Sequence, residues 1–302
     1  MEKAIGGKYY PGDRTKNTVK SAAGNTARSA GGPWKARKAG LDGEALLGPA
    51  VRLTGFMYFL MILLPVYALF SSAGWKNTVS SLAKADNTAA LTISMKTTSL
   101  TAALIFLICT PVVFCLSNPS RKKEGLGSKL LELLVTMPTV LPPAVAGIGL
   151  LLAFGRNGIV GAWLGRIHVE VVFTPVAVVL AQFFVASGFY VQIVKTGMDA
   201  IEPEIFEVSY LFGLGKTETM IRVILPMLAK PVTAGLMLSW TRALGEFGAT
   251  IMFAGNMAER TRTIPLQIYT LLQTDIVSAA SVSLLLFMVS FALLFLLKIV
   301  FR

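Results

Sequence analysis

Arg242 and Glu246 are the residues whose type and spacing most directly suggest chemistry, because positions four apart share one face of a helix. They occur in an otherwise apolar stretch, where charged side chains face a bundle interior or a cavity. Two interpretations remain open: a structural ion pair that neutralises itself, or a pair that guides or gates an anion. His168 is the single histidine, and Cys109 and Cys115 lack the spacing of a metal or disulfide site. We therefore expect no catalytic residue and no metal site.

The elements that position this pair are apolar segments. Hydrophobic residues make up 54% of the 302 positions and charged residues only 15%, which indicates a membrane protein. Six segments approach the roughly 20 apolar residues of a membrane-spanning helix. They are Val51 to Phe70, Thr98 to Leu116, Leu130 to Phe154, Val171 to Val194, Met227 to Phe253 and Ala279 to Phe301. The sequence thus predicts an all-α membrane protein with six transmembrane helices.

Prolines interrupt the third and fifth of these segments. Pro138, Pro142 and Pro143 lie in the third and Pro231 in the fifth, so we expect kinks whose freed backbone groups bond to neighbouring helices. Pro142 and Pro143 are candidate gate residues. The prolines and glycines of the third segment permit either the bends of a gate or close helix packing, and both interpretations stay open.

The N-terminal residues 1–47 form a different region, rich in Gly, Ala, Ser, Thr and Lys without apolar periodicity. This composition predicts a disordered basic cytoplasmic tail that contacts anionic lipid. A nucleic-acid-binding arm is the alternative, but no aromatic residues interleave with the charges, so we predict no nucleic acid partner. Residues 48–302 would then form the transmembrane domain.

The distribution of Lys and Arg predicts the orientation in the membrane. With the N-terminus inside, about twenty of the 28 basic residues fall on the cytoplasmic side and about seven on the outer side. Cytoplasmic loops carry such an excess. We therefore expect a multi-pass protein of the cell membrane with both termini in the cytoplasm.

The loop between the fourth and fifth segments, about residues 195–226, has its own helical pattern. Apolar residues recur at helical spacing and two glycines then stop the helix before a second run from Lys216 to Ile224. The apolar residues are Ile205, Val208, Leu211 and Phe212, and the glycines are Gly213 and Gly215. Gly213 indicates a positive φ or a position without room for a Cβ, and Glu207 can cap or pair. A short amphipathic helix on a glycine turn is what docking into a partner's groove requires.

The stretch EVSYLFGLGKTETMIRVILP in this loop resembles the signature of binding-protein-dependent ABC import permeases, which begins Glu-Ala-Ala and ends hydrophobic-x-Leu-Pro. Four positions match this signature in spacing: Glu207, Gly213, Leu225 and Pro226. Val208 and Ser209 replace its two alanines. Two further stretches, PTVLPPAVAGIGLLLAFGRNGIVG from Pro138 and RALGEFGATIMFAGN from Arg242, together with TRTIPLQIY from Thr261, resemble molybdate permeases and their tungstate and sulfate relatives. Phe247, Gly248 and Ala249 favour molybdate or tungstate.

The resemblance implies a type I importer permease with a cytoplasmic coupling helix, in which those six residues contact an ATPase. It also implies a homodimer, two ATPase subunits and an extracytoplasmic oxyanion-binding protein. The chain has no P-loop, so ATP and Mg²⁺ would act on the partner; this subunit would hold no cofactor and would not be an enzyme by itself. The expected function is import of molybdate or tungstate by alternating access. The alternatives are a sulfate or thiosulfate permease, an ATP-independent secondary transporter, for which Glu246 is the only deep acidic residue, and a membrane scaffold without transport activity.

Overall fold

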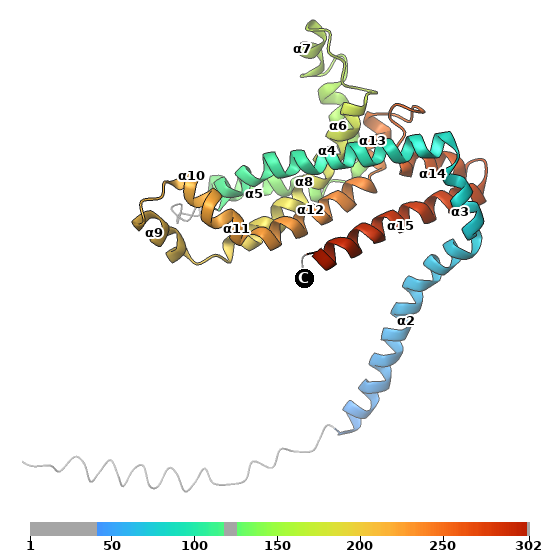
Figure 1. Cartoon of the computed structure of the whole chain (residues 1–302), viewed down its shortest axis with the longest axis horizontal. Helices are drawn as coiled ribbons and strands as arrows, with labels where there is room; N and C mark the ends of the chain where they lie inside the picture. The colour runs from blue at the N-terminus through green and yellow to red at the C-terminus, as the bar shows by residue number, and fades with distance from the viewer. Residues whose placement is uncertain (1–40, 118–125, 301–302) are drawn as a thin grey trace, which may run out of the picture. The chain divides into compact units, whose positions relative to one another are not determined.

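A computed structural model of the chain describes residues 41–117 and 126–300, and all secondary structure in these ranges is helical (Figure 1). The first forty residues of the predicted tail lie outside the described residues. A contact-based division after Leu63 separates the chain into two units. The second unit contains Arg242, Glu246 and the loop at about residues 195–226.

The helices before the middle of the chain are α2 Leu41–Ala73, α3 Trp75–Leu82, α4 Ala85–Leu116, α5 Leu126–Thr136, the 3-10 turn η1 Met137–Thr139, α6 Pro143–Phe154 and α7 Gly161–Arg166. The later helices are α8 Pro175–Asp199, α9 Pro203–Leu211, α10 Lys216–Glu218, the π-helical turn η2 Thr219–Ile224, α11 Leu225–Met227, α12 Ala229–Leu244, α13 Gly248–Phe253, α14 Ile264–Leu272 and α15 Ile276–Val300.

Four helices are individually long and apolar enough to cross a membrane, and the number rises to six if each of two bent helix pairs counts as one span. The four lie in α2, α4, α8 and α15, so the predicted first, second, fourth and sixth spans are confirmed as helices of sufficient length. α4 begins at Ala85 rather than at the predicted Thr98. Its first half carries buried polar side chains such as Asn87 and Ser94, which lower the hydropathy without ending the helix.

The predicted third span differs from the structure, because it is broken rather than kinked. α5 with η1 and the following α6 are bent by 108° relative to each other. Pro142 and Pro143 stand at this break, where a proline ring cannot continue the preceding helix.

The predicted fifth span, Met227 to Phe253, is also divided. α12 ends at Leu244, residues 245–247 leave the helix, and α13 begins at Gly248. On its other side α12 is bent by 74° from the helical run Lys216–Met227. The 74° bend lies at Leu228, directly before the first turn of α12, which contains Pro231, so the kink expected at this proline is present. The break at residues 245–247 contains no proline.

Helices α4, α8 and α12 form the centre of the second unit. Tyr190 of α8, Ile105 of α4 and Leu228, which precedes α12, are all buried in one apolar cluster. Polar groups cross the same interface. Thr110 and Tyr190 share a 2.6 Å hydrogen bond, and Ser239 of α12 donates to the carbonyl of Ala186 at 3.0 Å. Such bonds each contribute on average about 0.6 kcal/mol between membrane helices, and their geometry fixes the register of the packing.

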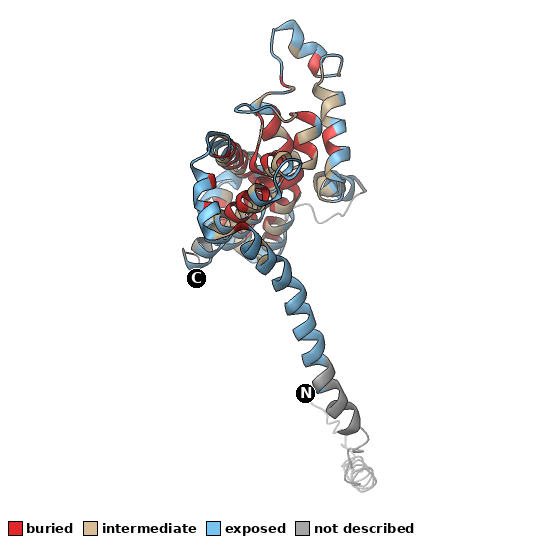
Figure 2. Cartoon of the chain, turned by 90° about the vertical axis from the view of Figure 1, so that its right-hand side faces the viewer, coloured by how far each residue is buried: buried red, intermediate tan, exposed pale blue. Residues whose placement is uncertain are grey.

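α2 has the opposite character. The side chains from Val51 to Leu64 are exposed, as Figure 2 shows for the helix leading from the N-terminus. A largely apolar exposed helix of this length is expected to lie against lipid or another polypeptide, because water would not stabilise it.

Candidate functional site

Two short helices, α6 and α13, each begin directly after a break in the chain and pack against each other; we call this place the α6–α13 junction. A Cβ added to Gly147 of α6 would lie 2.8 Å from both the Cα and the carbonyl oxygen of Ala249 in α13. A Cβ on Gly149 would meet nothing within 4 Å. The close-packing interpretation therefore applies to Gly147, which lets the two backbones approach each other.

The candidate gate prolines lie at this junction. A Cβ on Gly248, the first residue of α13, would lie 3.0 Å from the Cβ of Pro143. Pro142 is the residue immediately before α6. The structure thus brings Pro142 and Pro143 next to the break that contains Glu246, although about a hundred positions separate them in the sequence.

Arg242 and Glu246, four positions apart, form the expected ion pair at the break between α12 and α13. The Nη1 atom of Arg242, in the last turn of α12, lies 2.7 Å from the Oε2 atom of Glu246. The Oε1 atom of Glu246 accepts a hydrogen bond from the backbone N–H of Ala249 at 2.8 Å. The Glu246 side chain is 1% exposed and that of Arg242 28%. Glu246 lies beyond the end of α12, so the pair joins two helices instead of sharing one helix face.

The second candidate region is residues 200–228, which we call the α8–α12 connection. It is anchored on one side by Phe206, which is buried in the apolar cluster with Met198 of α8 and with Ile224. Ser209 is also buried, and its hydroxyl donates to the carbonyl of Ile205 at 2.7 Å. Ser209, a predicted docking residue, is therefore on the buried side of α9 and not on its exposed side.

The other side of α9 is exposed. Leu211 is 86% and Phe212 83% exposed, and Val208 is about half exposed; these three residues form what we call the exposed edge of α9. The expectation that Ile205 shares this face is wrong, because Ile205 packs against the buried cluster. α9 is thus apolar on two sides, one covered by the bundle and one without a covering group among the described residues.

Glu207, Leu225 and Pro226 complete the predicted set. Glu207 is exposed in the middle of α9 and forms no ion pair with any residue in the described ranges. Leu225 packs against the buried cluster, and Pro226 is exposed in α11. These two residues lie where the connection turns toward α12, so the structure gives them a role in directing the chain.

Gly213 ends α9 with a positive φ of 81°. Its N–H donates to the carbonyl of Tyr210 at 3.0 Å, and the N–H of Leu214 donates to the carbonyl of Ser209 at 3.2 Å. These are the two hydrogen bonds of a Schellman motif. A Cβ here would meet nothing within 4 Å, so the conformation, not a lack of space, requires glycine. Another residue would cost about 1–2 kcal/mol in this left-handed region.

In the ranges 41–117 and 126–300, no group of three or more His, Cys, Asp or Glu side chains lies close enough together to hold a metal ion. His168 lies in an exposed loop with a φ of 57°, and both cysteines are free.

The chain was compared with known protein families. Residues 113–302 match the family described as binding-protein-dependent transport system inner membrane component. This range includes the α6–α13 junction and the α8–α12 connection.

Several curated proteins are similar over most of the chain. A probable transport system permease protein, NifC of Clostridium pasteurianum, is 43% identical over 86% of this chain and 90% of its own length. The molybdenum transport system permease protein ModB of Mycobacterium tuberculosis is 33% identical over 80% of this chain and 89% of its own. The sulfate transport system permease protein CysT of Escherichia coli is 36% identical over 56% of this chain and 61% of its own.

Solved structures show the same fold. A bacterial ABC transporter involved in the import of the acidic polysaccharide alginate matches with a TM-score of 0.66 and 15% identity, over 86% of this chain and 96% of that one. The alginate transporter in complex with an alginate pentasaccharide-bound periplasmic protein matches with a TM-score of 0.67 and 16% identity.

The buried ion pair leads to a stability prediction. Replacing Arg242 by Met leaves the Glu246 carboxylate buried without its cation, so we expect the free energy of unfolding to fall by about 3–5 kcal/mol. Adding Glu246→Gln should recover most of this loss, because the neutral amide oxygen still accepts the N–H of Ala249. Unfolding of the purified protein in detergent micelles measures both effects. An Arg242→Met variant as stable as the wild type would contradict the assignment of this pair to the break.

Proposed function

Because this chain belongs to the family of binding-protein-dependent transport system inner membrane components, and is thus a permease of an ABC importer, we propose that it carries molybdate or tungstate into the cytoplasm. It acts in the cell membrane as a homodimer with two ATPase subunits and an extracytoplasmic oxyanion-binding protein. Both termini face the cytoplasm, as the distribution of basic residues indicates.

The exposed edge of α9 is the observation that supports ATP coupling. Leu211 and Phe212 project from a segment that Phe206 fixes to the bundle, so a force on the edge is carried into the core. Apolar side chains presented by a short helix dock into a partner's groove. The α8–α12 connection is accordingly the coupling loop that the ATPase contacts, and ATP and Mg²⁺ act on that partner.

The relatives support the substrate class. The NifC and ModB proteins, the latter a molybdenum permease by name, match 86% and 80% of this chain, whereas the sulfate permease CysT matches 56%. Molybdate, tungstate and sulfate are all tetrahedral dianions, so one translocation path suits each of them. Molybdate or tungstate is the favoured cargo, and sulfate or thiosulfate is the alternative that the similarity to CysT supports.

The α6–α13 junction supplies the element that changes during transport. Each of its helices follows a break, and backbone breaks at membrane depth occur where the chain is buried in protein or lines a cavity. Closure of the ATPase dimer draws the two coupling loops together, and the broken helices reorient from inward to outward facing. Arg242 and Glu246 set the angle between α12 and α13 throughout.

Uptake by the complete transporter tests this function. The complex is purified through a tag on this chain, reconstituted in proteoliposomes with its binding protein, and supplied with labelled molybdate. We expect uptake that requires ATP and is inhibited by an equal concentration of tungstate but not of sulfate. Equal inhibition by sulfate would move the assignment to the sulfate and thiosulfate class. Uptake without ATP would indicate a secondary transporter, and no uptake at all would contradict the proposal.

Removing the exposed edge of α9 should release the ATPase. Burial of a Leu or Phe side chain contributes roughly 1.5–3 kcal/mol, so Leu211→Ser with Phe212→Ser should weaken ATPase binding by at least about tenfold. Ile159→Ser is the matched control, because Ile159 is 91% exposed but lies before α7. Copurification and titration of the ATPase measure the effect. Equal binding by both variants would exclude this edge as the docking surface.

Two glycines of the connection should respond differently to substitution. Gly213 has a φ of 81° and Gly215 a φ of −71°, and neither would bring a Cβ within 4 Å of another group. Gly213→Val should cost about 1–2 kcal/mol and lower oxyanion uptake per ATP hydrolysed. Gly215→Val should leave that ratio unchanged. The same loss in both variants would mean that bulk rather than backbone conformation matters here.

A further inference from the structure

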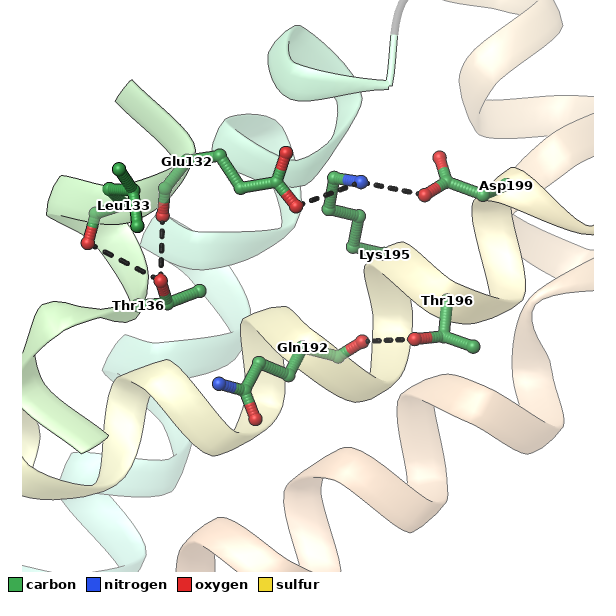
Figure 3. Close-up of polar contacts among 7 residues, drawn as sticks. All are labelled: Glu132, Leu133, Thr136, Gln192, Lys195, Thr196 and Asp199. Atoms are coloured by element: carbon green, nitrogen blue, oxygen red, sulfur yellow. Dashed lines mark hydrogen bonds and ion pairs between the residues drawn. The ribbon is translucent and has the colours of Figure 1, made fainter. Parts of the chain in front are cut away.

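Lys195 lies near the end of α8, the helix from which the α8–α12 connection leaves. Its Nζ atom is 2.7 Å from the Oδ2 atom of Asp199 on the same helix and 3.2 Å from the Oε1 atom of Glu132 on α5. Figure 3 shows the ammonium group between the two carboxylates, one from each helix. The sequence reveals the Lys195–Asp199 spacing but gives no sign of Glu132. Lys195 therefore joins α5 to the last turn of α8.

Two further contacts continue this link along α8. Gln192 donates from Nε2 to the Oγ1 atom of Thr139 at 3.4 Å. A Cβ on Gly188 would lie 2.5 Å from the Cγ2 atom of Thr139, so α8 and η1 approach closely there. Gly188, Gln192 and Lys195 follow one face of the helix at spacings of four and three. Thr139 is the last residue of η1, directly before the break that leads to α6.

α5 is covered by the bundle near its end, where Val135 packs against the apolar cluster. Its apolar side chains are largely exposed, at 43% to 65%, in the residues Leu130, Leu131, Leu133 and Leu134. The three charged side chains are 21% to 49% exposed, so the ion pair adds little to the stability of the whole protein. Its effect is on the position of a helix with few apolar contacts to the bundle.

We infer that Lys195 is a positioning residue, which holds α5 and the end of α8 as one rigid unit and so transmits movement of the coupling loop to the break before α6. At its other end the unit meets the coupling loop, because Met198 packs with Phe206. This inference rests on the proposed function. It assigns a specific path between the ATPase-contacting segment and the α6–α13 junction.

Two neutral substitutions distinguish the contact of Lys195 with Glu132 on α5 from its contact with Asp199 on α8. Glu132→Gln removes the carboxylate on α5, whereas Asp199→Asn removes only the carboxylate on α8 itself. In the reconstituted complex we expect Glu132→Gln to lower oxyanion uptake per ATP hydrolysed by about two- to fivefold, the range of a half-exposed ion pair. Asp199→Asn should keep the wild-type ratio. Equal ratios for all three proteins, or a loss confined to Asp199→Asn, would overturn the inference.

A covalent bridge tests whether the two helices move together. Glu132→Cys and Lys195→Cys are combined in a Cys115→Ser background, because Cys115 is exposed and Cys109 buried. Without a bridge this variant should show the same reduced ratio as Glu132→Gln. A short bifunctional maleimide should restore it, while the same reagent on either single cysteine should not. Bridging that stops uptake would overturn the inference, because the helices would then have to separate.

A reporter at the break distinguishes failure of this inference from failure of the proposed function. Val140 is 84% exposed, so Val140→Cys in the Cys115→Ser background should react with a maleimide at a rate that ATP changes. Glu132→Gln should reduce this ATP-induced change, and Asp199→Asn should not. A complex that hydrolyses ATP without moving any oxyanion would refute the proposed cargo. The reaction rate of Val140→Cys would still show whether Lys195 transmits the movement. An unreduced change in Glu132→Gln would overturn the inference alone.

Discussion

The carboxylate of Glu246 holds together the two parts of a broken helix, because one oxygen pairs with Arg242 of α12 and the other accepts the N–H of Ala249 in α13. In a bilayer no water is present to satisfy such groups, so a break persists only where protein atoms bind its free donors and acceptors. With α13 held in this way, Ala249 lies against Gly147 of α6. The junction therefore combines this polar link with the buried apolar contacts of Ala146 in α6 and Phe253 in α13.

The α8–α12 connection is held differently, since it is anchored in the bundle on one side and presents an apolar surface on the other. Phe206 and Ser209 provide the firmness by being buried, while Leu211 and Phe212 remain exposed. The positive φ of Gly213 ends the helix directly after Phe212 and keeps that side chain at the edge. The buried side of this segment is joined to α8 through the packing of Phe206 with Met198.

α8 connects both regions. It packs against α4 and α12 through apolar side chains and hydrogen bonds such as that between Thr110 and Tyr190. In its second half it approaches η1 through Gly188 and α5 through Lys195. α12 leads directly from the α8–α12 connection to the break at residues 245–247, and α8 approaches the break before α6 through its contacts with Thr139.

The sequence by itself determined the helical class, the four uninterrupted spans, the helix and glycine turn around Gly213, and the pairing of Arg242 with Glu246. These depend on local periodicity, hydropathy and spacing, which a single chain displays directly. Only the tertiary structure decided that Ser209 is buried while Leu211 is exposed, that the prolines of the third span make a 108° break, and that Glu132 meets Lys195. Those outcomes depend on which distant segment covers each face, and hydropathy along the chain carries no record of that.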